Sequence, residues 1–343
     1  MTVHVYSSFT FSYLNRARVL FETLKRHHPD WVLWAFVTDH APSSFHFDPK
    51  AESFDKLVYV EELFGDETDQ WLFGMDVVEA CTAIKGKALT HIFETTGCEK
   101  VIYLDPDIAV FGSLQPISDL LEDNSIVLTP HQTDPESDNR AICDNEIASL
   151  QYGSFNLGFL AVKADSEGRR FANWWSDRLY DWCHDRLDIG VFVDQKWCNL
   201  VPCFFDNTKI LRDPGYNVAS WNISQRKLTI DQTGTILVNG HPLRFFHFTK
   251  LGVVGDTMTK RYAQGNVEVY EIWWWYTHRV TQLTDSSIPN GWWHFGTYSD
   301  GEKIQKESRV VYRNRKDVRD KFPTPFRSGS DSFQNWVRLE LAS

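Results

Sequence analysis

The 343-residue chain has 42% hydrophobic and 15% aromatic residues, a composition that predicts a packed globular protein with a substantial core. Its formal net charge of −11 argues against general nucleic-acid binding. The six cysteines form no Cys-x-x-Cys pair, which argues against a zinc site or a disulfide framework and favours free thiols in a reducing cytoplasm. The first residues lack a signal-peptide pattern, and no apolar stretch is long enough to predict a membrane span.

Strand-like and helix-like segments alternate along the first two thirds of the chain. Strands are predicted over residues 3–7, 32–37, 57–59, 101–104, 125–128 and 159–162, and helices over 15–28, 76–95 and 167–186. Residues 131–145 are predicted to form a polar loop. This alternation predicts an α/β protein whose central sheet is covered on both faces.

After about Gly255 the sequence becomes rich in aromatic and basic residues. Trp273-Trp274-Trp275-Tyr276 is expected in a helix, a hairpin is expected around Ser299-Asp300-Gly301, and residues 303–327 hold nine basic and three acidic residues. We therefore divide the chain into a catalytic part, 1–255, and an appendage, 256–343, with residues 328–332 as a candidate linker stub.

Two carboxylates, Asp105 and Asp107, follow the apolar run Val101-Ile102-Tyr103 and flank a proline. They are therefore expected at the carboxyl end of a buried strand, the edge of an α/β sheet at which ligands bind. Proline stiffens this turn and removes one backbone donor. Two hard oxygen ligands held in this way suit Mg2+ or Mn2+, which commonly bridge protein carboxylates to a diphosphate. An isolated Asp-x-Asp is more often only a polar turn, so the interpretation depends on further segments.

Four later segments carry side chains that could join Asp105 and Asp107 in one site: Ser154–Phe159, Phe192–Gln195, Tyr216–Asn222 and Arg244–Lys250. They carry amides, a carboxylate, one histidine and a lysine beside apolar runs. The loop after the first strand, residues 7–11, has neither a Gly-x-Gly-x-x-Gly fingerprint nor a phosphate-binding Gly-Lys-Ser/Thr loop.

In this order, the segments resemble nucleotide-sugar glycosyltransferases of the GT-A fold, in particular family 8 and related bacterial surface-polysaccharide enzymes. The resemblance runs from Val3 to Lys250 and includes Tyr13-Leu14-x-x-Ala17-Arg18 and Cys81–Lys85; the tail motif Phe322-Pro323-x-Pro325-Phe326 also fits. It implies a GT-A (Rossmann-like) mixed sheet flanked by helices, with an aromatic and basic helical appendage. One departure is the absence of an acidic residue in the loop 7–11, which leaves the nucleotide base open.

The resemblance also implies site residues. It assigns metal ligation to Asp105, Asp107 and His247, and catalysis or sugar contact to Asp194, Gln195 and Asn156. It assigns donor binding to Thr10, Tyr13, Arg18, Lys85, Asp105, His131 and Lys250. The implied cofactor is Mn2+ or Mg2+. The implied partners are a UDP-sugar or GDP-sugar donor and a glycan, lipid-linked or protein acceptor, and retention of configuration is favoured over inversion.

Each assignment has a structural alternative. His247 and His131 are candidates for ordinary core histidines, Asp194 for the N-cap of a helix that begins at Gln195, and Asn156 for a turn cap. A sugar nucleotidyltransferase and a non-catalytic sugar-nucleotide or glycan-binding module are the alternative functions. The nucleotidyltransferase would normally carry a Gly-rich basic loop after the first strand, which residues 7–11 do not form.

The basic segment 303–327 has two interpretations. It forms either a solvated helical surface or a peripheral contact with anionic lipid, with Val310, Val311, Tyr312 and Phe322 at the interface. The second interpretation fits a cytoplasmic enzyme at the inner face of a bacterial membrane.

Overall fold

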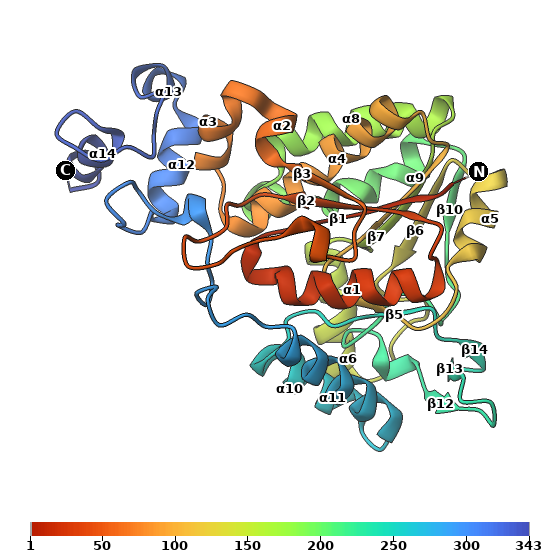
Figure 1. Cartoon of the computed structure of the whole chain (residues 1–343). Helices are drawn as coiled ribbons and strands as arrows, with labels where there is room; N and C mark the ends of the chain where they lie inside the picture. Colours follow the sequence, from red (N-terminus) through yellow and green to blue (C-terminus); the bar gives the residue numbers. More distant parts are fainter. Residues whose placement is uncertain (1, 343) are drawn as a thin grey trace.

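A seven-stranded mixed sheet forms the centre of the protein in the computed structural model, which describes residues 2–342 (Figure 1). In sheet order, its strands are β10 (Thr208–Ile210), β6 (Ile126–Pro130), β7 (Phe155–Lys163), β4 (Lys100–Leu104), β1 (His4–Phe9), β2 (Val32–Val37) and β3 (Lys56–Tyr59). Strand β7 is antiparallel to β4 and β6, and every other neighbouring pair is parallel. The predicted α/β class with a mixed central sheet is confirmed.

Helices cover both faces of this sheet (Figure 1). One face packs against α4 (Val77–Thr96) and α8 (Ser166–Trp182), and the other against α1 (Leu14–His27) and α5 (Gln115–Asp123). Strands β1 and β4 are buried along their whole length, as expected for strands covered on two sides. The carboxyl ends of β1 and β4 therefore lie at one edge of a rigid layer.

Helix α4 has clear sequence signals at both ends. The side chain of Asp76 accepts hydrogen bonds from the amides of Val78 and Glu79, and Glu79 bonds back to the amide of Asp76, forming a capping box. The helix ends at Gly97, whose φ of 64° is the left-handed conformation typical of a C-cap glycine. These signals fix the position of Lys85, which lies in the interior of α4.

Three small sheets surround the main one. They are β11 (Val218–Ala219) with β15 (Phe245–His247) and β5 (Ile108–Val110); β12 (Leu228–Ile230) with β13 (Ile236–Val238) and β14 (His241–Pro242); and the ribbon of β8 (Asp185–Arg186) and β9 (Val191–Phe192). The sheet that contains β5 and β15 joins the turn after β4 to the His247 segment. It is the part of the fold that assembles the site described below.

The C-terminal region consists of helices packed on two sides of the catalytic part (Figure 1). They are α10 (Val253–Ala263), α11 (Val267–Gln282), α12 (Lys306–Asn314), α13 (Lys316–Lys321) and α14 (Phe333–Ala342). The sequence-based boundary at residue 255 falls inside α10. Between α11 and α12 the chain crosses the end of β2, where the amide of His294 donates to Asp39 at 2.7 Å. The predicted hairpin is present, with the amide of Tyr298 bonded to the carbonyl of Glu302.

Two predicted elements were wrong in part. The expected loop 131–145 contains α6 (Asn139–Ala141) and the start of the π-helical segment Ile142–Ile147, which continues into α7 (Ala148–Tyr152). The helix expected to reach Arg186 ends at Trp182, because Cys183 leaves helical geometry and the chain turns into β8. Both differences lie at the rim of the candidate site, where tertiary contacts outweigh helical periodicity.

The basic segment is exposed only in part. Tyr312 and Phe322 were expected at a lipid interface, yet both belong to a buried aromatic cluster. Arg309 is buried and donates to the backbone carbonyls of Phe73 and Phe295. Several basic residues instead hold the C-terminal helices against the catalytic part. Across residues 2–342, no helix combines the length and apolarity that crossing a bilayer requires.

Candidate active site

Nine of the predicted site residues line one cavity of about 690 Å3 at the carboxyl ends of the central strands. They are Lys85, Asp105, Asp107, His131, Asn156, Asp194, Gln195, His247 and Lys250. Their positions span 166 residues of sequence, so the fold gathers groups that the chain keeps far apart. The three predicted donor residues nearest the N-terminus lie outside this lining.

Strand pairing brings His247 to the carboxylate pair. After β4 the chain turns at Asp105-Pro106-Asp107 and enters β5, which runs antiparallel to β15 with Ile108 opposite His247. The amide of Phe248 then donates to the carbonyl of Asp107 at 2.9 Å. As a result, Nε2 of His247 lies 3.0 Å from Oδ1 of Asp107 and 3.7 Å from Oδ2 of Asp105.

Asp107 and His247 each support the charged form of the other. Burial disfavours ionisation of Asp107, but the neighbouring imidazole outweighs it, and the net effect lowers the pKa of this carboxyl. Burial likewise disfavours the imidazolium, yet Asp107 and Asp105 together raise the pKa of His247. The alternative of an ordinary core histidine does not fit a ring nitrogen that faces two carboxylates.

Lys85 joins the carboxylate turn to the Asp194 segment. Its Nζ lies 3.1 Å from Asp105, 2.7 Å from Asp194 and 3.0 Å from the carbonyl of Leu157. Burial disfavours the ammonium, but the two carboxylates outweigh it and raise the pKa of Lys85. The hydroxyl of Tyr103 donates to the same oxygen of Asp105 at 2.5 Å. Lys85 is therefore a fixed cation behind the carboxylate pair.

Asp194 follows the ribbon strand β9 and is almost fully buried. Val193, just before it, has a φ of 35°, a conformation that costs energy for a β-branched residue. Burial raises the pKa of Asp194, and Lys85 only partly offsets this. The alternative role as a helix N-cap was wrong, because Gln195 occupies that position and no side chain caps the helix.

Asn156 and His131 form a polar part of the cavity lining. The amide nitrogen of Asn156 is 3.2 Å from Nε2 of His131, and its oxygen accepts from Gly158 and Asn217. Burial lowers the pKa of His131 to about 4, so its ring is neutral at physiological pH. Asn217 is held with a positive φ of 51°. The sequence analysis named the 216–222 segment but did not single out Asn217.

Gln195 and Lys250 come from two walls of the cavity, one formed by the segment after β9 and one by the turn before α10. The amide nitrogen of Gln195 donates to the carbonyl of Tyr152 at 3.0 Å, which fixes the orientation of its side chain. Lys250 is exposed and has a φ of 52°, in the turn that leads into α10. Arg261 on α10 forms an ion pair with Asp144 of the π-helical segment, so the two walls are linked.

Three predicted donor residues do not line the cavity: Thr10, Tyr13 and Arg18. Thr10 is buried and bonded to Ser12. Arg18 forms an ion pair with Glu52 at 2.6 Å and donates to the carbonyl of Leu283, on a different side of α1. Tyr13 is 39% exposed and does not line the cavity.

Arg16 was missed by the sequence analysis. It stacks on the ring of Tyr13 at 4.0 Å, its charge contributes to lowering the pKa of Asp107, and its Nε is buried without a hydrogen-bond partner. The available signal was its spacing of three residues from Tyr13, which places both side chains on one face of α1.

The described part of the chain contains one group of side chains suited to a metal ion, formed by Asp105, Asp107 and His247. One ligand atom from each lies within 4.8 Å of the others. Two carboxylate oxygens and one imidazole nitrogen suit Mn2+ in particular, because carboxylates favour hard divalent ions and imidazole favours transition metals. The donor set therefore fits the cofactor implied by the sequence.

Comparison with known proteins agrees with this geometry. Residues 88–237 match the family described as Glycosyl transferase family 8. Two Bacillus subtilis (strain 168) proteins, both described as uncharacterized, are similar: YfnF is 28% identical over 189 residues and YfnD 24% over 181. These alignments cover 54% and 52% of this chain and 61% and 55% of the relatives, so the chain spans under two thirds of their length.

Solved structures of glycosyltransferases are also similar to the chain. The galactosyltransferase LgtC, in complex with donor and acceptor sugar analogs, has 19% identity and a TM-score of 0.47, covering 85% of this chain and 99% of that one. The glycosyltransferase GlyE of Streptococcus pneumoniae TIGR4 has 16% identity and a TM-score of 0.45, covering 85% and 65%.

Proposed function

We propose that this chain, which matches Glycosyl transferase family 8 over residues 88–237, is a glycosyltransferase that transfers a sugar from a nucleoside-diphosphate donor with the help of Mn2+. The observation that carries the proposal is the grouping of Asp105, Asp107 and His247 beside Lys85 in one cavity. In this proposal, the metal site and the exposed Lys250 supply positive charge for a diphosphate, and Lys85 supports the carboxylates from behind. The family match favours this function over a nucleotidyltransferase or a non-catalytic binding module.

We assign the metal to Asp105, Asp107 and His247, where it would neutralise charge that develops on the departing diphosphate. Lys250, exposed in the turn before α10, binds the same phosphates directly. Lys85 holds Asp105 and Asp194 in place through its two ion pairs. A UDP-sugar is the first candidate donor and a GDP-sugar the second.

Asp194, Gln195 and Asn156 form the proposed sugar pocket. A sugar that loses its diphosphate gains positive character at the anomeric carbon, which a nearby carboxylate or amide oxygen stabilises. Asp194 is already paired with Lys85, so it is poorly placed to serve as the general base that an inverting reaction needs. This favours retention of configuration.

The acceptor is proposed to be a glycan, a lipid-linked sugar or a protein, in bacterial surface-polysaccharide synthesis in the cytoplasm. Residues 1–255 supply the donor site in this proposal, and the appendage 256–343 helps to hold the acceptor. A membrane contact through residues 303–327 would have to use the exposed side chains Lys303, Lys306, Lys316, Lys321 and Arg327.

Donor turnover tests this function. Purified protein is incubated with each of several UDP-sugars and GDP-sugars, with and without Mn2+, and release of the nucleoside diphosphate is followed. We expect Mn2+-dependent release from donors of one base and a loss of about 100-fold or more in Asp107→Asn. Asp213→Asn, a carboxylate away from the cavity, is the matched control. Equal release with and without Mn2+, or in Asp107→Asn, would contradict the proposal.

A further inference from the structure

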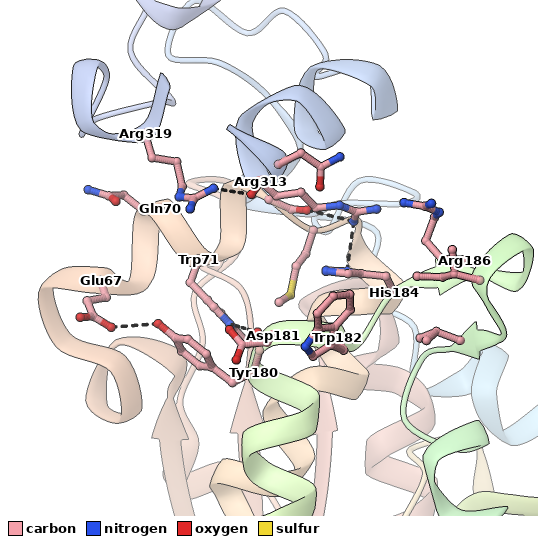
Figure 2. A pocket seen from close by; sticks show the side chains of 15 residues that line it. Glu67, Gln70, Trp71, Tyr180, Asp181, Trp182, His184, Arg186, Arg313 and Arg319 are labelled. Atoms are coloured by element: carbon pink, nitrogen blue, oxygen red, sulfur yellow. Dashed lines mark hydrogen bonds between the residues drawn. The ribbon is translucent and has the colours of Figure 1, made fainter. Parts of the chain in front are cut away.

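A second cavity, of about 660 Å3, lies between the catalytic part and the C-terminal helices α12 and α13 (Figure 2). Its walls come from α3 (Thr68–Phe73), the end of α8, the ribbon β8–β9 and the two C-terminal helices. None of the residues assigned above to the donor site lines it. This second cavity is comparable in size with the donor cavity, and the function proposed above does not use it.

The β8–β9 ribbon separates the two cavities. Asp185 and Phe192, which are paired across the ribbon, line the donor cavity. The next pair, Arg186 and Val191, lines the second cavity. This is the alternation expected of a strand whose successive side chains point to opposite sides. A molecule in the second cavity is therefore one ribbon away from the site of sugar transfer.

Aromatic side chains form the floor of the second cavity. Trp182 is 49% exposed and Tyr180 is 38% exposed, at the end of α8. Trp71 supports Tyr180, with the two rings stacked at 6.0 Å and the indole nitrogen of Trp71 bonded to the Tyr180 carbonyl. Exposed, rigidly backed aromatic rings attract the C–H edges of a ligand, and aromatic rings commonly line small-molecule sites.

Basic side chains surround this floor, as Figure 2 shows for Arg186, Arg313 and Arg319. Arg186 is bound only to Asp188, and both side chains of this pair are exposed, so an anionic ligand can replace Asp188 at little cost. Arg313 is fixed by the buried Glu79 and lies 3.1 Å from His184. Arg319 donates to backbone carbonyls of α12. These bonds are to neutral groups and do not neutralise its charge.

The acidic side chains of the lining are Glu67 and Asp181. Glu67 accepts a hydrogen bond from the hydroxyl of Tyr180 at 2.9 Å and lies away from Arg186 in Figure 2. The end of the cavity nearest the ribbon therefore holds two arginines, Arg186 paired with the exposed Asp188 and Arg313 paired with the buried Glu79. Arginine binds carboxylate and phosphate groups in a planar, bidentate manner, which lysine does not.

We propose that this second cavity is an acceptor subsite for a glycan that carries carboxylate or phosphate groups. Trp182 packs against a sugar ring, Arg186 binds the anionic group, and the reacting end of the glycan passes around the ribbon to the donor cavity. The proposal rests on the glycosyltransferase function proposed above, and it adds the chemical class of the acceptor.

Direct binding tests the subsite without requiring turnover. Calorimetry compares tetragalacturonate and a tetramer of glycerol phosphate with neutral maltotetraose at low ionic strength, where surface charge is least screened. We expect the Kd of one anionic tetramer to be at least about tenfold lower than the Kd of maltotetraose. Which tetramer binds identifies the anionic group as carboxylate or phosphate.

Matched variants locate the binding. Trp182→Ala and Arg186→Gln should each weaken binding of that tetramer about tenfold, whereas Trp274→Ala, at an indole that is 69% exposed elsewhere, and Arg327→Gln should leave it unchanged. Affinity for UDP with Mn2+ should be the same in all four variants. Absence of binding by both anionic tetramers, or equal affinity in Trp182→Ala and Arg186→Gln, would overturn the subsite. Failure of the wild-type protein to bind any nucleoside diphosphate with Mn2+ would instead overturn the proposed function.

Discussion

Gly158 and His247 lie so close together that a Cβ at position 158 would be 2.4 Å from Cε1 and 2.6 Å from Nδ1 of the imidazole. No side-chain carbon tolerates such an approach, so glycine at 158 leaves the space that His247 occupies. The carbonyl of Gly158 also accepts a hydrogen bond from the amide of Asp105 at 2.8 Å. One glycine therefore helps to position two of the three candidate metal ligands.

Gly158→Ala should displace His247 and weaken Mn2+ binding by about tenfold or more, measured by calorimetry on the purified protein. Gly265→Ala is the control, because a Cβ there meets nothing within 4 Å and the residue is not in the left-handed region of φ. If Gly158→Ala binds Mn2+ as well as the control does, His247 is not a ligand.

Lys85→Met should destabilise the protein by about 3 kcal/mol or more, because it leaves the buried carboxylate of Asp194 without its partner. Lys85→Met/Asp194→Asn should recover at least about 1 kcal/mol of this loss, since the second change removes the unpaired charge. Urea denaturation of the two single variants and the double variant measures the coupling. Strictly additive effects would show that the pair does not interact.

The buried Glu79 should make stability depend on acid pH. Burial raises its pKa, but His184 and Arg313 outweigh this and lower the pKa from 4.5 to about 2. A lowered pKa stabilises the fold fully above the unfolded value of 4.5, and this contribution of about 3 kcal/mol is lost as pH falls towards 2.

Urea denaturation of wild type and Glu79→Gln across this pH range tests that contribution. The wild-type protein should be the more stable above pH 4.5, and the difference should shrink as pH falls through the folded-state pKa of about 2. A difference that stays constant with pH would mean that Glu79 is not ionised in the folded protein.

Arg16 and Arg18 offer a matched comparison on one helix. Arg16→Ala should lower affinity for a nucleoside diphosphate by about tenfold, because its charge acts at Asp107. Arg18→Ala should leave that affinity unchanged and lower stability instead, because Arg18 is bound to Glu52, whose side chain is only 6% exposed. The reverse pattern would support the original sequence-based choice of Arg18.

The sequence predicted the strands that carry the site because those strands are continuous buried apolar runs, as β4 and β7 show. The strand predicted at 101–104 correctly placed Asp105 at its carboxyl end. The approach of His247 to Asp107 depends on the register of β5 with β15, which pairs residues 139 positions apart and is not readable from periodicity. The expectation that His247 lies beside Asp107 came from the resemblance to a known family.

Residues whose role depends on a distant partner could not be predicted in the same way. Arg313 was expected on an exposed basic surface, but Glu79, 234 positions earlier, binds it in the interior. Arg18 was named from the family resemblance and Arg16 was not named, and the ion pair of Arg18 with Glu52 could not be read from the sequence. Asp144 of the π-helical segment 142–147 pairs with Arg261 on α10, 117 positions later, which local sequence pattern does not predict.

Thermal stabilisation by UDP and GDP, with and without Mn2+, on wild type and Asp107→Asn is the measurement that tests the central claim most directly. A nucleoside diphosphate at about 100 times its Kd should stabilise the wild-type protein by about 2.7 kcal/mol. We predict this shift for one base, only with Mn2+, and its loss in Asp107→Asn. No shift with either base, or an equal shift in Asp107→Asn, would contradict a metal-dependent donor site at Asp105, Asp107 and His247.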